Sequence, residues 1–239
     1  MNSKKKKKRT KPKDFINALD FFFGMSFFQG RNYNLSKRYY LLAMNYLRSN
    51  DFSSVQPIHK FKNSKDKKEK IKIIYKSFLG ELESAGLVKE ADRIMVLDTI
   101  GIANQIKSQY QQNIIEYLIC EIKKGDILKA SDFLKEIYSI GAKITGLVLR
   151  DIVHLYKLDK YINQIDEYSL LQPIDTWVHQ DKKKIGIINN DEISKTEATE
   201  ITKFCLQNDI NPFHYNEGAW YLGSQSLTFA IKRLTDNED

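Results

Sequence analysis

Two helical patterns joined by a turn of only four residues constrain the fold of this 239-residue chain more than any other feature. The first pattern contains Ala130, the turn is Ser139–Ala142, and Lys143 opens a second, long apolar pattern. This second helix runs out into a polar loop that ends at Asp175, where a further helix is expected. Local geometry therefore pins a lysine at one helix N-terminus and an aspartate at the next.

Helical periodicity continues through most of the remaining chain. Apolar residues recur at helical spacing, whereas Asn-Gly hairpins and the sustained alternation typical of strands are nearly absent. The sequence therefore predicts an all-α fold. Ser194 and Glu197 have the spacing of a capping box, and residues 185–190 form a short β-like connector. The expected helices cover residues 14–28, 35–47, 71–85, 88–103, 112–124, 130–138, a stretch from 143, 194–207 and 215–233.

The basic charge of the chain lies in one segment, residues 1–13. The formal net charge is +8, and this segment holds eight lysines and arginines and no acidic residue, so the remainder is formally neutral. Such a block repels itself, and we expect a disordered basic tail. It would attract nucleic-acid phosphates without sequence specificity. A solvated tail without a partner is the competing interpretation, and a nuclear-import signal receives less weight.

Composition places limits on location and class. Hydrophobic residues make up 42% and charged residues 28%, which is typical of a globular protein. No run of 18 apolar residues is present, so no membrane span is expected, and no apolar segment after the basic start indicates a secretory signal. Cys120 and Cys205 lie in apolar helical patterns, which predicts two buried free thiols. These features indicate a cytoplasmic protein. Abundant Lys, Asn and Ile suggest an AT-rich prokaryotic genome, and we expect the protein to be associated with the nucleoid.

Two segments resemble signatures of the HhH-GPD superfamily of base-excision DNA glycosylases. Ser-Ile-Gly-Ala-Lys-Ile-Thr-Gly, residues 139–146, is similar to the helix-hairpin-helix turn Gly-hydrophobic-Gly-x-Lys-x-Ala, with Ser139 for the first glycine and Thr145 for the alanine. Pro-Ile-Asp, residues 173–175, is similar to Pro-Val-Asp. The interval between the lysine and the aspartate is longer than in endonuclease III and resembles that of the archaeal 8-oxoguanine DNA glycosylases.

The resemblance implies two helical subdomains flanking a groove within residues 14–239. It implies a helix-hairpin-helix at about 130–157 and a catalytic aspartate loop at 158–176. It also implies a monomer that removes an oxidised base, with 8-oxoguanine favoured, from double-stranded DNA. No metal or organic cofactor is expected. The chain lacks the four-cysteine cluster of endonuclease III relatives, which excludes their iron–sulfur site.

The resemblance makes Lys143 the nucleophile and Asp175 its assistant. An amine that attacks the sugar must be neutral, so the pKa of Lys143 has to fall from about 10.4 through partial burial and the helix dipole. The alternative is an exposed lysine on a charged helix. Asp175 would stabilise the positively charged sugar, or would simply cap a helix, and both roles can hold together.

Backbone N–H groups at the turn would bind a DNA phosphate, which assigns Ser139, Gly141 and Ala142 to DNA contact. A side chain at Gly141 would block the approaching DNA backbone, and glycine can also take positive φ. An ordinary connection between two helices is the simpler interpretation. Gln29 and Arg31 are candidates for filling the space left by a flipped base, although a plain surface turn is the favoured interpretation.

A flipped base needs a pocket with a stacking surface. Residues 212–220 resemble a C-terminal stretch of the archaeal enzymes, which implies that Trp220 stacks on the base and Asn216 bonds its edge. Leu147 would form the opposite face. Core packing is the alternative for Trp220. A family histidine that contacts phosphate is replaced by Trp177, and His179 is a substitute unless it is a surface histidine.

Two other classes of function remain open. The chain could be a catalytically inactive helix-hairpin-helix DNA-binding protein, in which Lys143 is dispensable for binding. It could also be an RNA-binding protein that acts through its basic tail, in which case removal of residues 1–13 would abolish nucleic-acid binding.

Overall fold

The computed structural model describes residues 14–27, 33–49, 55, 73, 75–106, 110, 112–184, 186, 194 and 196–221. Over these ranges the regular elements are α-helices and one short 3-10 helix, without a β-strand. The prediction of an all-α fold is therefore confirmed for the described residues. The predicted basic tail, Gln29, Arg31, most of the segment 185–190 and the residues after Tyr221 lie outside them.

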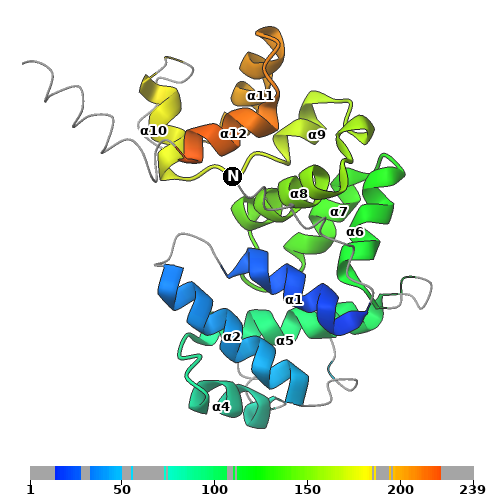
Figure 1. The fold of residues 1–239 in the computed structure, drawn as a ribbon, viewed down its shortest axis with the longest axis vertical. Helices are drawn as coiled ribbons and strands as arrows, with labels where there is room; N and C mark the ends of the chain where they lie inside the picture. Colours follow the sequence, from blue (N-terminus) through cyan, green and yellow to red (C-terminus); the bar gives the residue numbers. More distant parts are fainter. Residues whose placement is uncertain are drawn as a thin grey trace, which may run out of the picture.

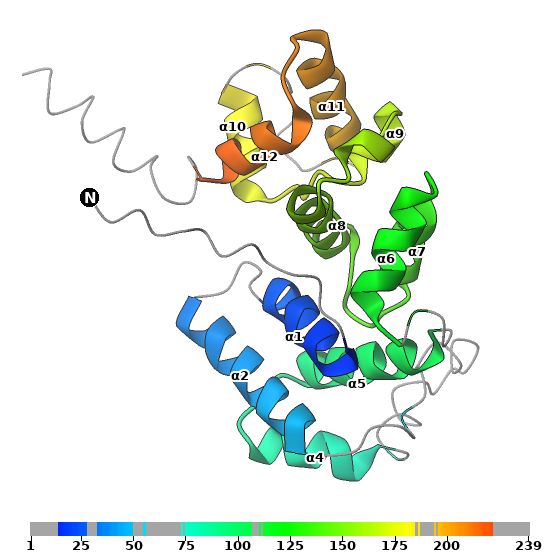
Figure 2. The ribbon, with the colours of Figure 1, turned by 45° about the vertical axis from the view of Figure 1, so that its right-hand side comes forward.

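The first half of the chain gathers at one end of the molecule (Figures 1 and 2). It comprises α1 (Phe15–Ser26), α2 (Tyr33–Ser49), α4 (Lys76–Ser84) and α5 (Glu90–Gln105). Asp14 caps α1 by accepting a hydrogen bond from the backbone N–H of Asn17 over 2.8 Å. Helix α5 is buried along most of its length, and its buried apolar side chains belong to the main core.

The middle of the chain forms α6 (Ile114–Lys123), α7 (Ile127–Lys135) and α8 (Ala142–Tyr156). Asn113 caps α6, and Asp126 caps α7 by accepting from the backbone N–H of Lys129 over 3.0 Å. That cap explains why α7 begins three residues before the predicted start at Ala130.

The last part of the chain contains η3 (Asp159–Tyr161), α9 (Ile165–Ser169), α10 (Thr176–Lys184), α11 (Glu197–Gln207) and α12 (Pro212–Tyr221). Helices α9 to α12 lie together at the other end of the molecule, with α8 between them and the first group (Figures 1 and 2). The predicted loop 158–176 is therefore partly helical, which corrects the expectation. A capping box formed by Gln164 and Glu167 stabilises the start of α9.

One cluster of buried apolar side chains extends through α1, α2 and α4–α8 and includes Leu171 and Phe213. Val178 of α10, Ile201 of α11 and Ala219 of α12 are buried outside this cluster. The last helices therefore have a small packing region of their own. Among the described residues, no helix is long and apolar enough to cross a membrane.

The two cysteines are free thiols in different surroundings. Cys205 is fully buried, as expected, but Cys120 is only half-buried, which corrects the prediction for that residue. Its thiol lies 3.6 Å from the Glu116 carboxylate, one turn earlier on α6.

Candidate functional site

The turn before α8 has a strained backbone at Ser139. Its φ is 63°, in the left-handed region that residues other than glycine rarely adopt. The N–H of Ile140 donates to the carbonyl of Ile137 over 3.1 Å, and the N–H of Tyr138 donates to the buried Asp98 carboxylate over 2.7 Å. A glycine, the residue expected here from the resemblance, would take this conformation at no steric cost. Ser139 takes it inside a turn that α5 anchors through Asp98.

Gly141 is the N-cap of α8 and has an extended backbone, with φ −97° and ψ −176°. The expectation of a positive φ at Gly141 is therefore wrong, because the left-handed residue of this turn is Ser139. A Cβ at Gly141 would meet no other atom within 4 Å, and Gly141 and Ala142 are both exposed. Helix α8 thus begins without a capping side chain, and its first backbone N–H groups point out of the helix. Such an N-terminus can accept an anion.

Lys143 is the second residue of α8 and is exposed. The expectation of partial burial is wrong, because the turn does not cover the first residues of the helix. The interpretation of Lys143 as an exposed lysine is confirmed as far as exposure is concerned. Its role as a nucleophile stays a prediction.

A cavity of about 620 Å³ opens beside the N-terminus of α8. Its wall includes Lys143 of α8, Lys135 of α7 and Ile174 of the loop before α10. It is a different hollow from the base pocket that the sequence predicts, because the predicted pocket residues do not line it. Those residues, all of them described, are Leu147, Asn216 and Trp220.

The loop before Asp175 passes directly over α8 at Gly146. A Cβ at this glycine would lie 3.2 Å from the carbonyl oxygen of Leu170 and 3.2 Å from the backbone nitrogen of Pro173. Both distances are shorter than ordinary contacts between a Cβ and a heavy atom, so glycine permits the crossing. The loop that carries Asp175 therefore touches α8 less than one helical turn after Lys143.

Asp175 caps α10. Its Oδ1 accepts a hydrogen bond from the backbone N–H of Val178 over 3.0 Å, and the residue is half-buried. The interpretation of Asp175 as a helix cap is therefore confirmed. A cap and a chemical role are compatible, and the chemical role stays a prediction.

Asn216 of α12 lies inside the protein, between α8 and the loop before Asp175. It is completely buried; its Oδ1 accepts from Nη1 of Arg150 over 3.0 Å, and its Nδ2 donates to the carbonyl of Pro173 over 3.4 Å. Both ends of the amide therefore join α8, α12 and this loop. Contact with a flipped base would require this completely buried side chain to become accessible, and the predicted base contact stays a prediction.

The other two predicted pocket residues are more accessible. Trp220 is 45% exposed near the end of α12, and Leu147 is half-buried on α8, one turn beyond Lys143 on the same face. The interpretation of Trp220 as a core residue is wrong. Its predicted stacking on a base is not tested by its exposure.

Charged side chains of both signs continue along that face of α8. Arg150 Nη2 lies 3.1 Å from Asp151 Oδ1, and Arg150 Nε lies 3.8 Å from a Glu217 carboxylate oxygen. The pKa of Asp151 is raised above its ordinary value. Burial is the largest cause of the rise and Glu217 adds to it, whereas Arg150 acts against it. The rings of His154 and His214 lie close by, 6.1 Å apart. This part of the face is therefore mixed in charge rather than a simple basic stripe.

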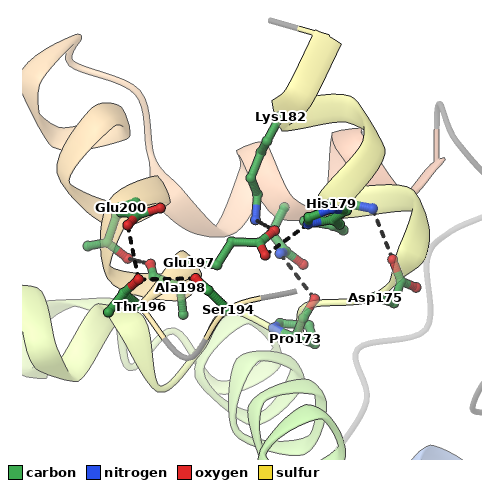
Figure 3. A network of polar contacts seen from close by, with 12 residues as sticks. Pro173, Asp175, His179, Lys182, Ser194, Thr196, Glu197, Ala198 and Glu200 are labelled. Carbon is green, nitrogen blue, oxygen red and sulfur yellow. Dashed lines mark hydrogen bonds and ion pairs between the residues drawn. The ribbon is translucent and has the colours of Figure 1, made fainter. Parts of the chain in front are cut away.

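A buried ionic cluster joins α10 to α11 (Figure 3). Glu197 Oε1 accepts from Nζ of Lys182 over 2.9 Å, and Glu197 Oε2 lies 3.0 Å from Nδ1 of His179. All three side chains are buried, and Lys182 is completely so. Burial raises the pKa of the nearby Cys205 thiol to about 11, and Lys182 acts against this rise.

This cluster corrects two sequence interpretations. Glu197 does not close a capping box, because its carboxylate bonds the two buried side chains and α11 has Thr196 as a cap without a side-chain bond. His179 is not a surface residue. The sequence pattern could have indicated this burial, because positions 175, 178, 179 and 182 lie on one face of a helix. If that face packs on the core, His179 and Lys182 are buried and need an anion beside them.

No group of three or more His, Cys, Asp or Glu side chains among the described residues is arranged to hold a metal ion. Comparisons of the chain with protein-family models, with curated proteins and with solved structures find no match.

Proposed function

We propose that this protein is a DNA glycosylase with abasic-site lyase activity, in which Lys143 is the nucleophile and Asp175 assists it. The observation that carries the proposal is the start of α8. An exposed lysine lies in the first turn of a helix whose N-terminus has no capping side chain, and the loop that carries Asp175 touches the same helix at Gly146.

The substrate of the proposed reaction is double-stranded DNA with one oxidised base, with 8-oxoguanine favoured. The turn Ser139–Ala142 and α8 would act as a helix-hairpin-helix that binds a backbone phosphate. DNA would then lie in a groove between the helices that precede α8 and those that follow it, with the flipped base near Trp220. The protein would act as a monomer in a prokaryotic cytoplasm.

The chemistry uses one amine and one carboxylate. The neutral amine of Lys143 attacks the sugar carbon C1′, and the glycosidic electron pair leaves with the base, which takes up a proton. Opening of the sugar ring then gives a Schiff base between the amine nitrogen and C1′. Loss of a C2′ proton expels the 3′ phosphate and breaks the strand. The Asp175 carboxylate stabilises the positive charge on the sugar and carries protons to and from the amine.

Borohydride trapping tests the proposal. Duplexes with one 8-oxoguanine, one abasic site or neither are incubated with the protein, and reduction converts a Schiff base into a stable covalent complex. We expect complexes on both lesion duplexes for the wild type and none for Lys143→Gln. Lys135→Gln is the matched control, because Lys135 lines the same cavity without a proposed chemical role.

The outcomes separate the alternatives. A complex on the abasic duplex alone would keep the lyase and replace 8-oxoguanine by another base. A complex that persists in Lys143→Gln and disappears in Lys135→Gln would show that Lys135, and not Lys143, is the nucleophile. Absence of any trapped complex with the wild type would exclude the proposed enzyme activity through a Schiff base.

A catalytically inactive DNA-binding protein is the second candidate, and the exposure of Lys143 favours it, because the proposed nucleophile was expected to be partly buried. It predicts tight binding to DNA in Lys143→Gln and no trapped complex in the wild type. Loss of all nucleic-acid binding after deletion of residues 1–13 would instead favour a protein that acts through its basic tail.

A further inference from the structure

Helix α10 begins directly after Asp175, and most of its described buried side chains are polar. The buried side chains described on α10 are Val178, His179 and Lys182, and only the first is apolar. Val178 also lies outside the main apolar cluster. Two of these three described side chains are polar, and their contacts help to fix where α10 lies.

Glu197 supplies those contacts from the first turn of α11. One carboxylate oxygen accepts from the Lys182 ammonium over 2.9 Å, and the other lies 3.0 Å from the His179 ring nitrogen (Figure 3). The N-terminus of α11 favours a negative charge at this position. Removal of the carboxylate would break the ion pair between Glu197 and the completely buried ammonium of Lys182, and breaking a buried ion pair from one side is strongly destabilising.

The contact is relayed to Asp175 within a single turn of α10. The backbone N–H of His179 donates to the carbonyl of Asp175 over 2.9 Å, and the Asp175 carboxylate accepts from the N–H of Val178. On the other side, Asn216 holds the carbonyl of Pro173. The Asp175 carboxylate is thus held between a loop anchored by α12 and a helix anchored by Glu197.

We infer that Glu197 is a positioning residue: through Lys182 and His179 it holds α10, and thereby holds the Asp175 carboxylate where the reaction needs it. The inference rests on the proposed function, since it concerns the chemical role of Asp175. A misplacement of about 1 Å can slow a reaction about 100-fold even when the changed residue lies away from the reacting atoms.

The test compares Glu197→Gln with a double variant, Glu197→Gln with Lys182→Met, which removes both buried charges together. Glu200→Gln is the control on the same helix, because Glu200 bonds Thr196 and not α10. Amide hydrogen exchange of α10 is measured beside the kcat and KM for cleavage of an abasic duplex.

In Glu197→Gln we expect exchange of the α10 amides to rise at least about tenfold, and kcat to fall by about 10- to 100-fold with little change in KM. The double variant should regain most of the protection and of kcat, because the buried ammonium is removed together with the carboxylate. Glu200→Gln should behave as the wild type. If Glu197→Gln does not fold, recovery of exchange protection and kcat in the double variant carries the test.

Three results would overturn the inference. A Glu197→Gln protein with rapid α10 exchange and wild-type kcat would show that Glu197 is structural only. A fall in kcat without a change in exchange would show that it does not act through α10. A double variant that regains protection but not kcat would show that the charge itself is needed. A wild type without any trapped complex is a separate failure, because it removes the proposed function while the exchange data still report on α10.

Discussion

The backbone nitrogen of Pro173 lies only 3.2 Å from the point where a Cβ at Gly146 would be placed. This close approach puts the loop that leads to Asp175 against α8. It links the two halves of the proposed site through backbone rather than through side chains. A backbone contact cannot rotate away, so the site should be sensitive to any atom added at this glycine.

Gly146→Ala should lower the stability of the protein. In a helix interior, alanine stabilises a protein by about 1 kcal/mol relative to glycine. Forcing the added methyl group against the loop costs about 1–3 kcal/mol. The loop cannot easily move away, because Asn216 holds it through the carbonyl of Pro173. We expect a net loss of about 1 kcal/mol in the free energy of unfolding, measured with urea. Gly24→Ala is the control: its Cβ would meet nothing within 4 Å in α1, so it should gain about 0.5–1 kcal/mol. Equal gains in both variants would contradict the close approach.

Asp175→Asn should separate capping from chemistry. Asparagine caps a helix as well as aspartate does, so the free energy of unfolding should stay within about 0.5 kcal/mol of the wild type. Asp175→Ala should lose about 1 kcal/mol. Both variants should lose strand cleavage by at least about 100-fold, because neither has a carboxylate to stabilise the charged sugar. Wild-type cleavage in Asp175→Asn would mean that Asp175 is a cap alone.

Trp220→Ala should affect base removal more than folding. Trp220 is 45% exposed, so its loss should lower the free energy of unfolding by only about 1 kcal/mol. Under the proposed function, release of 8-oxoguanine should fall by about 10-fold or more, since stacking contributes about 1–3 kcal/mol per base. Trapping on an abasic duplex should persist. Tyr221→Ala, at the neighbouring and 59% exposed position, is the control. An equal loss in both variants would deny Trp220 a specific role.

Stability should fall in acid partly through Glu121. Burial by itself raises the pKa of this carboxyl, but hydrogen bonds from Lys124 at 2.6 Å and Lys129 at 2.9 Å outweigh it and leave the pKa below 4.5. A carboxyl with a lowered folded-state pKa stabilises the protein above its unfolded pKa, and the contribution is lost as the pH falls through the folded pKa. The free energy of unfolding, measured with urea near neutral pH and again below pH 4.5, should therefore change less between the two pH values in Glu121→Gln than in the wild type. Asp132→Asn, which removes an exposed ion pair with Lys135, should leave that difference unchanged.

Helix positions were predictable from the sequence where local signals were strong. Apolar periodicity indicated α5, α6 and α8, and Asp175 has the sequence context of a helix cap. Boundaries were less accurate where a side chain decides them: Asp126 caps α7 earlier than the apolar pattern suggests. Short elements such as α9 were missed, because five residues hold too little periodicity to be recognised.

The local chemistry of the turn was predictable only in part. The resemblance drew attention to the turn, but the left-handed residue there is Ser139 and not Gly141. The sequence also drew attention to Thr145 as the small residue after the lysine, whereas the close approach to the loop occurs at Gly146. A shift of one position turns a helical residue by about 100°, so only the packed helices decide which residue faces the loop.

The sequence by itself determined the all-α class, the short connection between α7 and α8, and the placement of Lys143 and Asp175 at two helix starts. Each of these depends on residues that are neighbours along the chain. The tertiary structure alone decided that Glu197 pairs with Lys182, that Asn216 bonds Arg150 and Pro173, and that Lys143 is exposed. The paired residues lie up to 66 positions apart in the sequence. Their polar groups are buried away from water and must find hydrogen-bond partners inside the protein, so the packing of the helices decides which residues pair.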